Sequence, residues 1–401
     1  MKKILFLSYY FHPDLSAGSF RSTSLINELS SQMNLLDEDC CIDVITTKPN
    51  RYKEYVIDAE KNENFSNNIS IYRKDVSKYN SSFVGQARAF FNYSRFVLTT
   101  IKSQKYVVVY ATSGRLFTAF LASYVAKKVL CDNLFLDIRD IFKETITDVF
   151  EKKKILIFFL NILLPIIEKL TFNSAKAINL VSPAFYDYFL KNKLAQNSKF
   201  YFYTNGIDDI FLNTISKKTP CKLGDKVKVI YAGNIGASQC LEKTLPKAAK
   251  RLEKTHDFYI IGDGANKENL IEEIKKTGNI NIFLNKPVDR NKLISLYEDS
   301  DVLFLQVDDK EAFRRVIPSK LFEYACFNKP IVSVIDGFGK EFINENIEGC
   351  YAVKPNDIDS LVKCLNSINF DFQINRSEFI KKYSRKNINQ IFASSILKYI
   401  K

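Results

Sequence analysis

Short apolar runs of strand length alternate with amphipathic stretches along the first half of the chain. The predicted strands are Lys2–Tyr10, Ile42–Thr46, Tyr106–Ala111, Leu134–Ile138 and Ala177–Val181. The predicted helices between them include Phe20–Leu29, Arg88–Lys102 and Leu116–Lys128. Continuously apolar strands separated by helices are typical of a parallel sheet that is covered on both faces.

The same rhythm begins again after the Asn-Gly turn near residue 205. The predicted strands here are Val227–Ala232, Phe258–Ile261, Ile280–Leu284, Val302–Leu305 and Ile331–Val334, and the helices are Leu241–Leu252, Lys267–Lys276, Arg290–Asp299 and Ser319–Phe327. We therefore predict an α/β fold of two tandem doubly wound, Rossmann-like domains with a cleft between them. The predicted domains are 1–205 and 206–377. Residues 378–401 read as one helical pattern that we expect to pack back on the first domain.

Composition excludes several classes of protein. A length of 401 residues exceeds what one core usually organises, which agrees with two domains. Eight cysteines without a CxxC pair and only two histidines argue against a metal centre and a disulfide framework. The net charge is +13, but no zinc finger or Arg-rich segment is present, so we predict no nucleic-acid partner.

One apolar run, Ile155–Ile167, follows the basic cluster Lys152–Lys154. The run is too short to span a bilayer, which needs about 20 residues. It is either a buried helix or a helix that lies in a membrane interface. Residues 101–200 carry a net charge of +7 and residues 251–350 a net charge of −4. This uneven distribution favours the interfacial alternative, with the first domain facing an anionic surface. No signal peptide is predicted at the N-terminus.

Polar loops follow several predicted strands, where doubly wound sheets bind their ligands. FHPDLSAGSFRS follows the first strand, and there Gly18, the helix-start amides and Arg21 could bind an anion. In the second half, Gly233, Asn234 and Gly236 lie in GNIGAS, and Gly262 and Gly264 lie in GDGANKENL. Neither loop is a GxGxxG fingerprint, so a nicotinamide cofactor is poorly supported. Plain connecting loops are the alternative; together, the two glycine-rich loops suggest a nucleotide.

The stretch RVIPSKLFEYACFNKPIV, from Arg315 to Val332, places polar residues at the start of a predicted helix. Pro318 fits the first helical position, and the amides of Ser319, Lys320 and Leu321 would then face a phosphate. Lys320 and Arg315 add positive charge. Glu323 lies one turn further along the face of Ser319, where it could accept the hydroxyls of a ribose. The alternative is an ordinary surface pair between Lys320 and Glu323.

Five segments in this order resemble the family 4 glycosyltransferases, which have the GT-B fold: SYYFHPDLSAGSFRS, NGID, YAGNIGASQCLE, IGDGANKENL and PSKLFEYACFNKPIV. PSK-x2-EY is similar to the bacterial lipopolysaccharide and capsule subgroup that includes L-fucosamine transferases. The resemblance implies that the second-domain glycines line the donor nucleotide, Ser319–Lys320 holds the diphosphate and Glu323 the ribose. Arg139 and Asp140 match a His-Asp pair near the sugar, and Arg315 stands where many members carry a second glutamate. These three are the candidate catalytic residues.

The resemblance implies transfer of a sugar from a nucleotide-diphosphate donor, most commonly a UDP-sugar, with retention and without a metal or cofactor. The expected acceptor is a lipid-diphosphate-linked sugar or a glycan in bacterial surface polysaccharide synthesis. The enzyme would act in the cytoplasm, attached peripherally to the inner face of the membrane. Two alternatives stay open: a UDP-sugar 2-epimerase of the same fold, and a non-catalytic polysaccharide-assembly protein.

Overall fold

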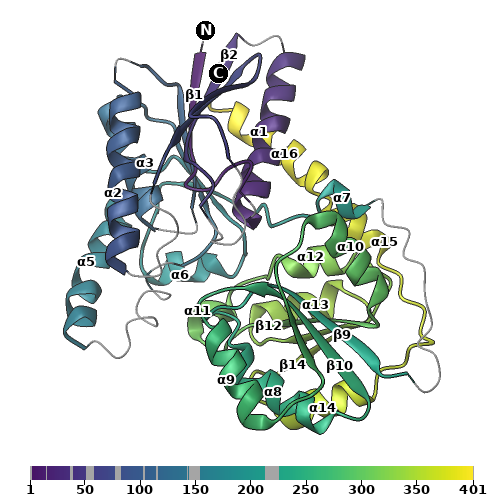
Figure 1. Ribbon diagram of the computed structural model, residues 1–401. Coiled ribbons are helices and arrows are strands. Elements are labelled where there is room, and N and C mark those ends of the chain that lie inside the picture. The colour runs from purple at the N-terminus through teal and green to yellow at the C-terminus, as the bar shows by residue number, and fades with distance from the viewer. Residues whose placement is uncertain are drawn as a thin grey trace. The chain divides into compact units, whose positions relative to one another are not determined.

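The computed structural model describes residues 2–14, 16–36, 39–50, 58–76, 83–102, 104–113, 116–141, 143, 154–212 and 225–400. The chain forms two compact units. Unit 1 consists of residues 1–205 and 385–401, and unit 2 of residues 206–384. The second unit thus extends past the boundary at residue 377 that the sequence suggested, and the chain returns to unit 1 for its last helix (Figure 1).

Unit 1 contains an eight-stranded sheet in the order β3-β4-β2-β1-β5-β6-β7-β8. Its strands are β1 (Lys2–Leu7), β2 (Cys40–Thr47), β3 (Asn62–Ser66), β4 (Ile69–Lys74), β5 (Val108–Ser113), β6 (Leu134–Ile138), β7 (Ala177–Leu180) and β8 (Lys199–Tyr201). All neighbours pair in parallel except β3 and β4. The antiparallel β3 was not predicted, because NENFS at the sheet edge is largely polar and lacks the apolar signal of a buried strand.

The helices of unit 1 cover both faces of this sheet (Figure 1). They are α1 (Ala17–Leu35), α2 (Phe83–Thr100), α3 (Leu116–Lys128), α5 (Lys154–Phe172), α6 (Phe185–Lys191) and α16 (Arg385–Leu397). Helix α16 packs beside α1. Its Phe392 is fully buried against the strands, with its ring stacked 4.7 Å from Tyr203. The last helix is therefore part of the core of unit 1.

Unit 2 contains a six-stranded, fully parallel sheet in the order β11-β10-β9-β12-β13-β14. Its strands are β9 (Val227–Asn234), β10 (His256–Asp263), β11 (Ile282–Asn285), β12 (Val302–Gln306), β13 (Ile331–Val334) and β14 (Cys350–Val353). Its helices are α7 (Asp209–Leu212), α8 (Leu241–Arg251), α9 (Lys267–Thr277), α10 (Arg290–Asp299), α11 (Glu311–Arg314), α12 (Lys320–Tyr324), α13 (Phe338–Asn346), α14 (Ile358–Asn366) and α15 (Ser377–Tyr383).

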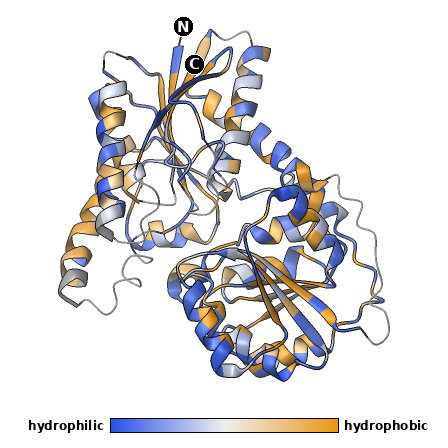
Figure 2. Cartoon of the chain, viewed as in Figure 1, coloured by the Kyte–Doolittle hydropathy of each residue, from blue (hydrophilic) through white to orange (hydrophobic). Residues whose placement is uncertain are grey.

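The predicted fold class is confirmed, with two α/β units whose apolar strands lie inside (Figure 2). Two local predictions were wrong. The tail is not one helix, because Ser384 adopts an extended conformation between α15 and α16. The helix predicted over Ser319–Phe327 is shorter, and α12 ends at Tyr324.

The apolar run Ile155–Ile167 lies in α5, and much of that helix is exposed. Six large apolar side chains of α5 are between 51 and 63 % exposed: Phe158, Phe159, Ile162, Leu163, Ile166 and Leu170. The alternative of a fully buried helix is therefore excluded for these residues. Within the described ranges, no helix is long and apolar enough to cross a membrane.

Candidate functional site

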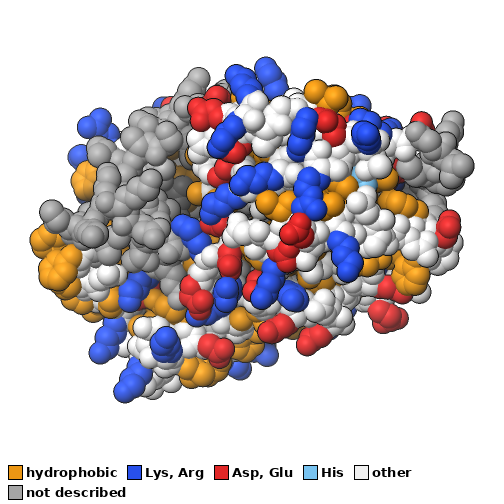
Figure 3. Space-filling view, turned by 90° about the horizontal axis from the view of Figure 1, so that it is seen from below, with side chains coloured by type: hydrophobic (Ala, Val, Ile, Leu, Met, Phe, Trp, Pro, Cys, Tyr) orange, Lys and Arg blue, Asp and Glu red, His pale blue; other side chains and the backbone are white. Residues whose placement is uncertain are grey.

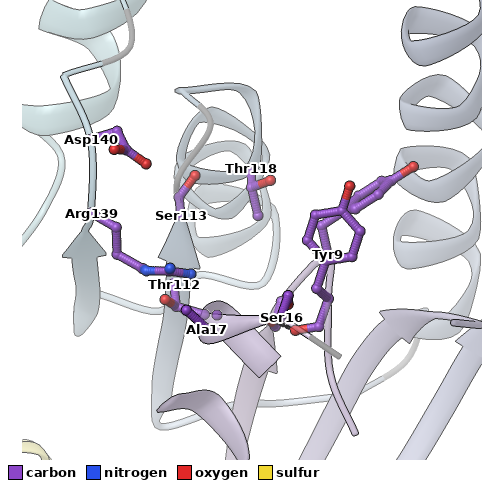
Figure 4. Close-up of a pocket in the computed structure, with 11 residues that line it drawn as sticks. Tyr9, Ser16, Ala17, Thr112, Ser113, Thr118, Arg139 and Asp140 are labelled. Carbon is purple, nitrogen blue, oxygen red and sulfur yellow. Dashed lines mark hydrogen bonds between the residues drawn. The ribbon is translucent and has the colours of Figure 1, made fainter. Parts of the chain in front are cut away.

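Unit 1 contains a pocket of about 260 Å³ at the carboxyl ends of β1, β5 and β6. Its wall also includes the first residues of α1 (Figure 4). Seven of the lining residues carry hydroxyl groups, and two are charged. The lining residues are Ser8, Tyr9, Tyr10, Ser16, Ala17, Gly18, Thr112, Ser113, Thr118, Arg139 and Asp140. The pocket therefore lies at the edge where doubly wound sheets bind their ligands.

Arg21, which the sequence suggested as an anion ligand, does not line this pocket. It is 1 % exposed, and its guanidinium donates to both carboxylate oxygens of Asp137 at 3.0 and 3.1 Å. Two further bonds go to the backbone oxygens of Tyr203 and Thr204. The hydrogen bonds of Arg21 thus connect α1 to β6 and to the segment that follows β8. These bonds give Arg21 a structural role, and its expected role in donor binding stays a prediction.

The arginine that lies beside Gly18 is Arg139, whereas the sequence suggested Arg21 for that place. Its side chain extends along the pocket wall, and its guanidinium lies where a β-carbon at Gly18 would project (Figure 4). Gly18 is therefore required for the close approach of Arg139, whereas the sequence suggested an approach by a ligand. Among the described residues, we find no hydrogen-bond partner for the Arg139 side chain, and its Nε is buried.

Asp140 follows Arg139 and lies at the exposed rim of the pocket. The protein that surrounds its carboxyl raises the pKa of Asp140 to about 6, although neighbouring Arg139 lowers it in part. A second, small cavity behind the pocket is lined by both Asp140 and Glu168 of α5. Glu168 is buried and accepts a hydrogen bond of 2.8 Å from the hydroxyl of Tyr188. The sequence analysis did not identify Glu168 as a candidate residue. A carboxylate near the end of a strongly apolar helix is the feature that could have pointed to it.

The glycines of unit 2 allow two loops to pack backbone to backbone. Gly262 at the end of β10 pairs in register with Gly233 of β9. A β-carbon at Gly262 would overlap the carbonyl oxygen of Gly233, and one at Gly264 would overlap that of Ile235. The amide of Ile235 donates to the carbonyl oxygen of Asp263 at 2.9 Å, which fixes this arrangement. These two glycines have a packing reason that needs no ligand.

The three residues predicted from the first loop have side-chain neighbours. Gly236 lies beside the amide of Asn234, where a β-carbon would clash. Asn234 Nδ2 donates to Gln239 Oε1 at 2.9 Å, so the amide group holds its own loop closed. Gly233, in contrast, faces Lys320: a β-carbon there would meet Cε and Nζ of that lysine. The structure thus brings together the GNIGAS loop and the PSK segment, which are far apart in the sequence.

The PSK segment forms a tight turn into α12. Lys320 is half-buried, and burial lowers its pKa while nearby Glu323 raises it in part. The amide of Leu321 donates to the carbonyl oxygen of Pro318 at 3.1 Å, and the Leu321 side chain is fully buried. The amide hydrogen of Leu321 is thus bonded within the turn, and its expected phosphate contact stays a prediction. Ser319 and Glu323 are both half-buried at this turn.

The remaining basic residues near this segment are paired with carboxylates. Arg315 donates to Glu311 at 2.7 Å, one helical turn earlier. Arg314 is bonded to Asp309, and Lys243 to the buried Asp308 at 2.8 Å. Arg315 lies in the connection between α11 and α12 of unit 2, while the other two candidate catalytic residues line the pocket of unit 1. In the part of the chain that the structure describes, no three metal-ligating side chains cluster.

Comparison with known proteins gives a family match in the second half and the fold of the whole chain. Residues 214–387 match the family "Glycosyl transferases group 1". Comparison with curated proteins finds no match.

Three solved structures cover nearly the whole chain at low identity. A glycosyltransferase from Rickettsia africae is 16% identical, covers 100% of this chain and 99% of its own, and has a TM-score of 0.63. HepE from Anabaena, in complex with UDP-glucose, is 14% identical, and the match covers 100% of this chain and 97% of HepE with a TM-score of 0.60. A sucrose-phosphate synthase from Thermosynechococcus elongatus is 11% identical, and the match covers 99% of this chain and 95% of the synthase with a TM-score of 0.67. At these identities the likeness concerns the fold. The chain therefore has the GT-B fold, and residues 214–387 match the glycosyltransferase group 1 family.

Proposed function

We propose that the protein is a glycosyltransferase that uses a nucleotide-diphosphate sugar, with UDP as the leaving group. The observation that carries the proposal is the contact between Lys320 and Gly233 within a glycosyltransferase group 1 domain. Lys320 and the turn at Pro318–Ser319 would bind the diphosphate, and Glu323 would accept the ribose hydroxyls. Charge-assisted hydrogen bonds of this kind are about twice as strong as neutral ones.

The glycine-rich loops would hold the nucleotide beside this turn. Gly233, Asn234, Gly236, Gly262 and Gly264 form a compact backbone surface at the ends of β9 and β10. Their close backbone packing brings both loops and Lys320 to one place, and the nucleotide would lie beside them. In unit 1, Gly18 would contact the donor phosphate, and Asp140 and Arg139 would contact the transferred sugar.

In the proposed reaction, the bond between the anomeric carbon and the UDP oxygen breaks, and an acceptor hydroxyl oxygen takes that place on the same face of the sugar. The hydroxyl proton leaves with the diphosphate. Lys320 and the backbone amides would stabilise the charge that develops on the leaving group. We propose that this requires no metal ion, so that activity persists in EDTA. Arg315 would add charge to the same region.

The proposed acceptor is a lipid-diphosphate-linked sugar or a glycan in bacterial lipopolysaccharide or capsule synthesis. A test incubates the protein with UDP-sugars and such acceptors and measures free UDP. Release of UDP that depends on the acceptor is expected. Conversion of the UDP-sugar without an acceptor would indicate the 2-epimerase instead, and absence of turnover with every pair would indicate a non-catalytic protein.

We also propose that the protein attaches peripherally to the cytoplasmic face of the membrane through α5. Six exposed apolar side chains lie along this helix, and Lys169 lies near its end. Apolar side chains are exposed at the left edge of the view in Figure 3, the side on which α5 lies in Figure 1, with Lys and Arg nearby. Lys152 and Lys153 lie outside the described residues, and Lys154 begins the helix. Each basic residue near an anionic surface contributes about 1 kcal/mol.

Flotation with anionic vesicles tests this attachment. The double substitution Phe158→Ser and Phe159→Ser should weaken binding about tenfold or more, because each exposed Phe would otherwise be buried among acyl chains. Ile391→Ser is the matched control, since Ile391 is 61 % exposed on α16 of the same unit. If wild-type protein does not float at low salt, or if the control loses as much binding, attachment through α5 is wrong.

A further inference from the structure

The pocket of unit 1 contains a cation whose donors have no acceptor among the described residues. The Arg139 guanidinium lies along the pocket wall at the first turn of α1, and its Nε is buried. A guanidinium carries five N–H donors in a fixed fork. A buried donor that stays unbonded, as Nε–H does here, is costly, and the half-buried guanidinium is placed to bind an anion in the pocket.

The nearest buried carboxylate cannot supply that anion. Asp137 accepts from Arg21 through both of its oxygens, and also from Asn179 at 2.7 Å and from Thr112 at 3.0 Å. Its acceptor positions are therefore occupied. Asp140 is adjacent in the sequence and attracts the Arg139 guanidinium electrostatically, but its carboxyl lies apart from that guanidinium and accepts no hydrogen bond from it (Figure 4). Arg139 is thus left facing the pocket, while its neighbour Arg21 is fully used.

The rest of the wall is suited to a sugar ring. Thr118 and Ser113 present hydroxyl groups toward the same space, and the ring of Tyr9 closes the opposite side (Figure 4). Hydroxyl groups both donate and accept, as sugar hydroxyls require. A volume of about 260 Å³ lies just below the range of pockets for drug-sized ligands, which begins at about 300 Å³. The space therefore matches one substituted sugar ring rather than a whole nucleotide sugar.

We propose that this pocket binds a sugar that carries an anionic group, a carboxylate or a phosphate, and that Arg139 selects it by bidentate hydrogen bonding. Guanidinium forks match the geometry of both anions. The anion would also lie near the start of α1 at Ala17 and Gly18, where the helix dipole favours negative charge. The inference rests on the proposed function in one respect: the sugar bound here is a substrate of the transfer.

The test measures binding of four probes to the full chain by saturation-transfer NMR and calorimetry: glucuronate, glucose 6-phosphate, glucose and inorganic phosphate. At least one anionic sugar should bind tenfold or more tightly than glucose, since charge-assisted bonds to a buried group are strong. A preference for glucuronate identifies a sugar carboxylate, and a preference for glucose 6-phosphate identifies a sugar phosphate. Arg139→Gln should remove the preference while leaving glucose binding unchanged.

Three variants make the result specific. Arg139→Lys keeps the charge without the fork and should retain only part of the preference. Arg314→Gln removes an exposed arginine of unit 2 that is paired with Asp309, and should bind the anionic sugar as wild type does. Glu323→Gln should weaken UDP binding but leave anionic-sugar binding intact. If wild-type protein neither binds UDP nor turns over any UDP-sugar but still selects an anionic sugar, the proposed function is overturned and this inference stands.

Three outcomes would overturn the inference. Glucose that binds as tightly as both anionic sugars would show that no anion is selected. Inorganic phosphate that binds as tightly as either anionic sugar would show that the sugar ring contributes nothing. An unchanged preference in Arg139→Gln, with a melting temperature equal to that of wild type, would place the selective group elsewhere.

Discussion

The two sheets end in polar loops at their carboxyl edges, but they use these loops differently. In unit 2 the loops after β9 and β10 pack against each other through glycine backbone, and Lys320 lies on Gly233. In unit 1 the loops leave a pocket, and Gly18 makes room for the side chain of Arg139. A glycine in a ligand-binding loop can therefore serve close packing of the backbone or the placement of one functional side chain. Substitution separates these two roles, because backbone cannot move aside and the end of an arginine can.

The largest expected effect is on the stability of unit 2. Gly262→Ala places a β-carbon against the Gly233 carbonyl and adds strain at a positive φ. Overpacking and backbone strain each cost about 1–3 kcal/mol, so we expect a loss of about 3 kcal/mol or more. Urea denaturation followed by circular dichroism measures the change. Gly278→Ala is the control, because Gly278 also has a positive φ but nothing lies within 4 Å of the added carbon. Equal losses for the two variants would mean that crowding is not the cause.

The next effect concerns the turn on which Lys320 and Glu323 lie. Glu323→Gln should weaken UDP binding and donor use by roughly 1.5–3 kcal/mol, or about tenfold to a hundredfold, because a charged acceptor of two hydroxyls is lost. Calorimetry with UDP and donor kinetics measure it. Glu345→Gln, an exposed glutamate on α13 of the same unit, should bind UDP normally. Unchanged UDP affinity in Glu323→Gln would remove the ribose contact from the proposal.

Much of this organisation could be predicted from the sequence, because strand runs and loop glycines are local signals. The apolar runs predict five strands of each sheet and place the polar loops at their carboxyl ends, whereas β3, β4, β8 and β14 were not predicted. The partner of each arginine could not be predicted. Arg21 and Asp137 are far apart in the sequence and meet only because α1 packs near β6. Which of Arg21 and Arg139 faces the pocket is decided by that pairing.

Other features escaped prediction for the same reason. Phe392 completes the core of unit 1 from the other end of the chain, and no local pattern says which sheet a terminal helix covers. The sequence did not decide whether α5 is buried or lies in a membrane interface. Periodicity identifies an apolar helix, but it does not say what packs against that helix. Glu168 lies in the same helix, and only the fold brings it behind Asp140.

A smaller effect is expected from Gly18→Ala, the counterpart of Gly262→Ala. The added β-carbon meets Nη1 of Arg139, the end of a flexible side chain that can turn away. Alanine is favourable inside a helix, so stability should change by less than about 1 kcal/mol. Affinity for the anionic sugar should nevertheless fall about tenfold, because the guanidinium is displaced from its place. The two measurements are a thermal melt and calorimetry. A variant with wild-type affinity would mean that Arg139 does not need this position to bind.

The smallest effect separates Asp140 from Arg139 within one pocket. With a pKa of about 6, Asp140 is neutral below that pH and ionised above it. Its negative charge opposes an anionic ligand, so affinity for glucuronate should fall several-fold as the pH rises from 5 to 7. Because the folded pKa lies above the ordinary value of 3.8, stability contributed by the neutral carboxyl is also lost as the pH rises through about 6.

Asp140→Asn should bind glucuronate equally well across this range of pH. Among the residues that the structure describes, the other charged groups around the pocket are Arg139, Arg21, Asp137 and Glu168. They remain in the variant, so a pH dependence that persists there would have to arise from one of them. Glucuronate is the right probe, since an ordinary carboxyl titrates below pH 5 and the ligand keeps its charge. If glucuronate affinity depends on pH in the wild type but not in Asp140→Asn, the titrating group is Asp140 at the rim of the pocket. Arg139 then supplies a positive charge that stays constant over this range of pH.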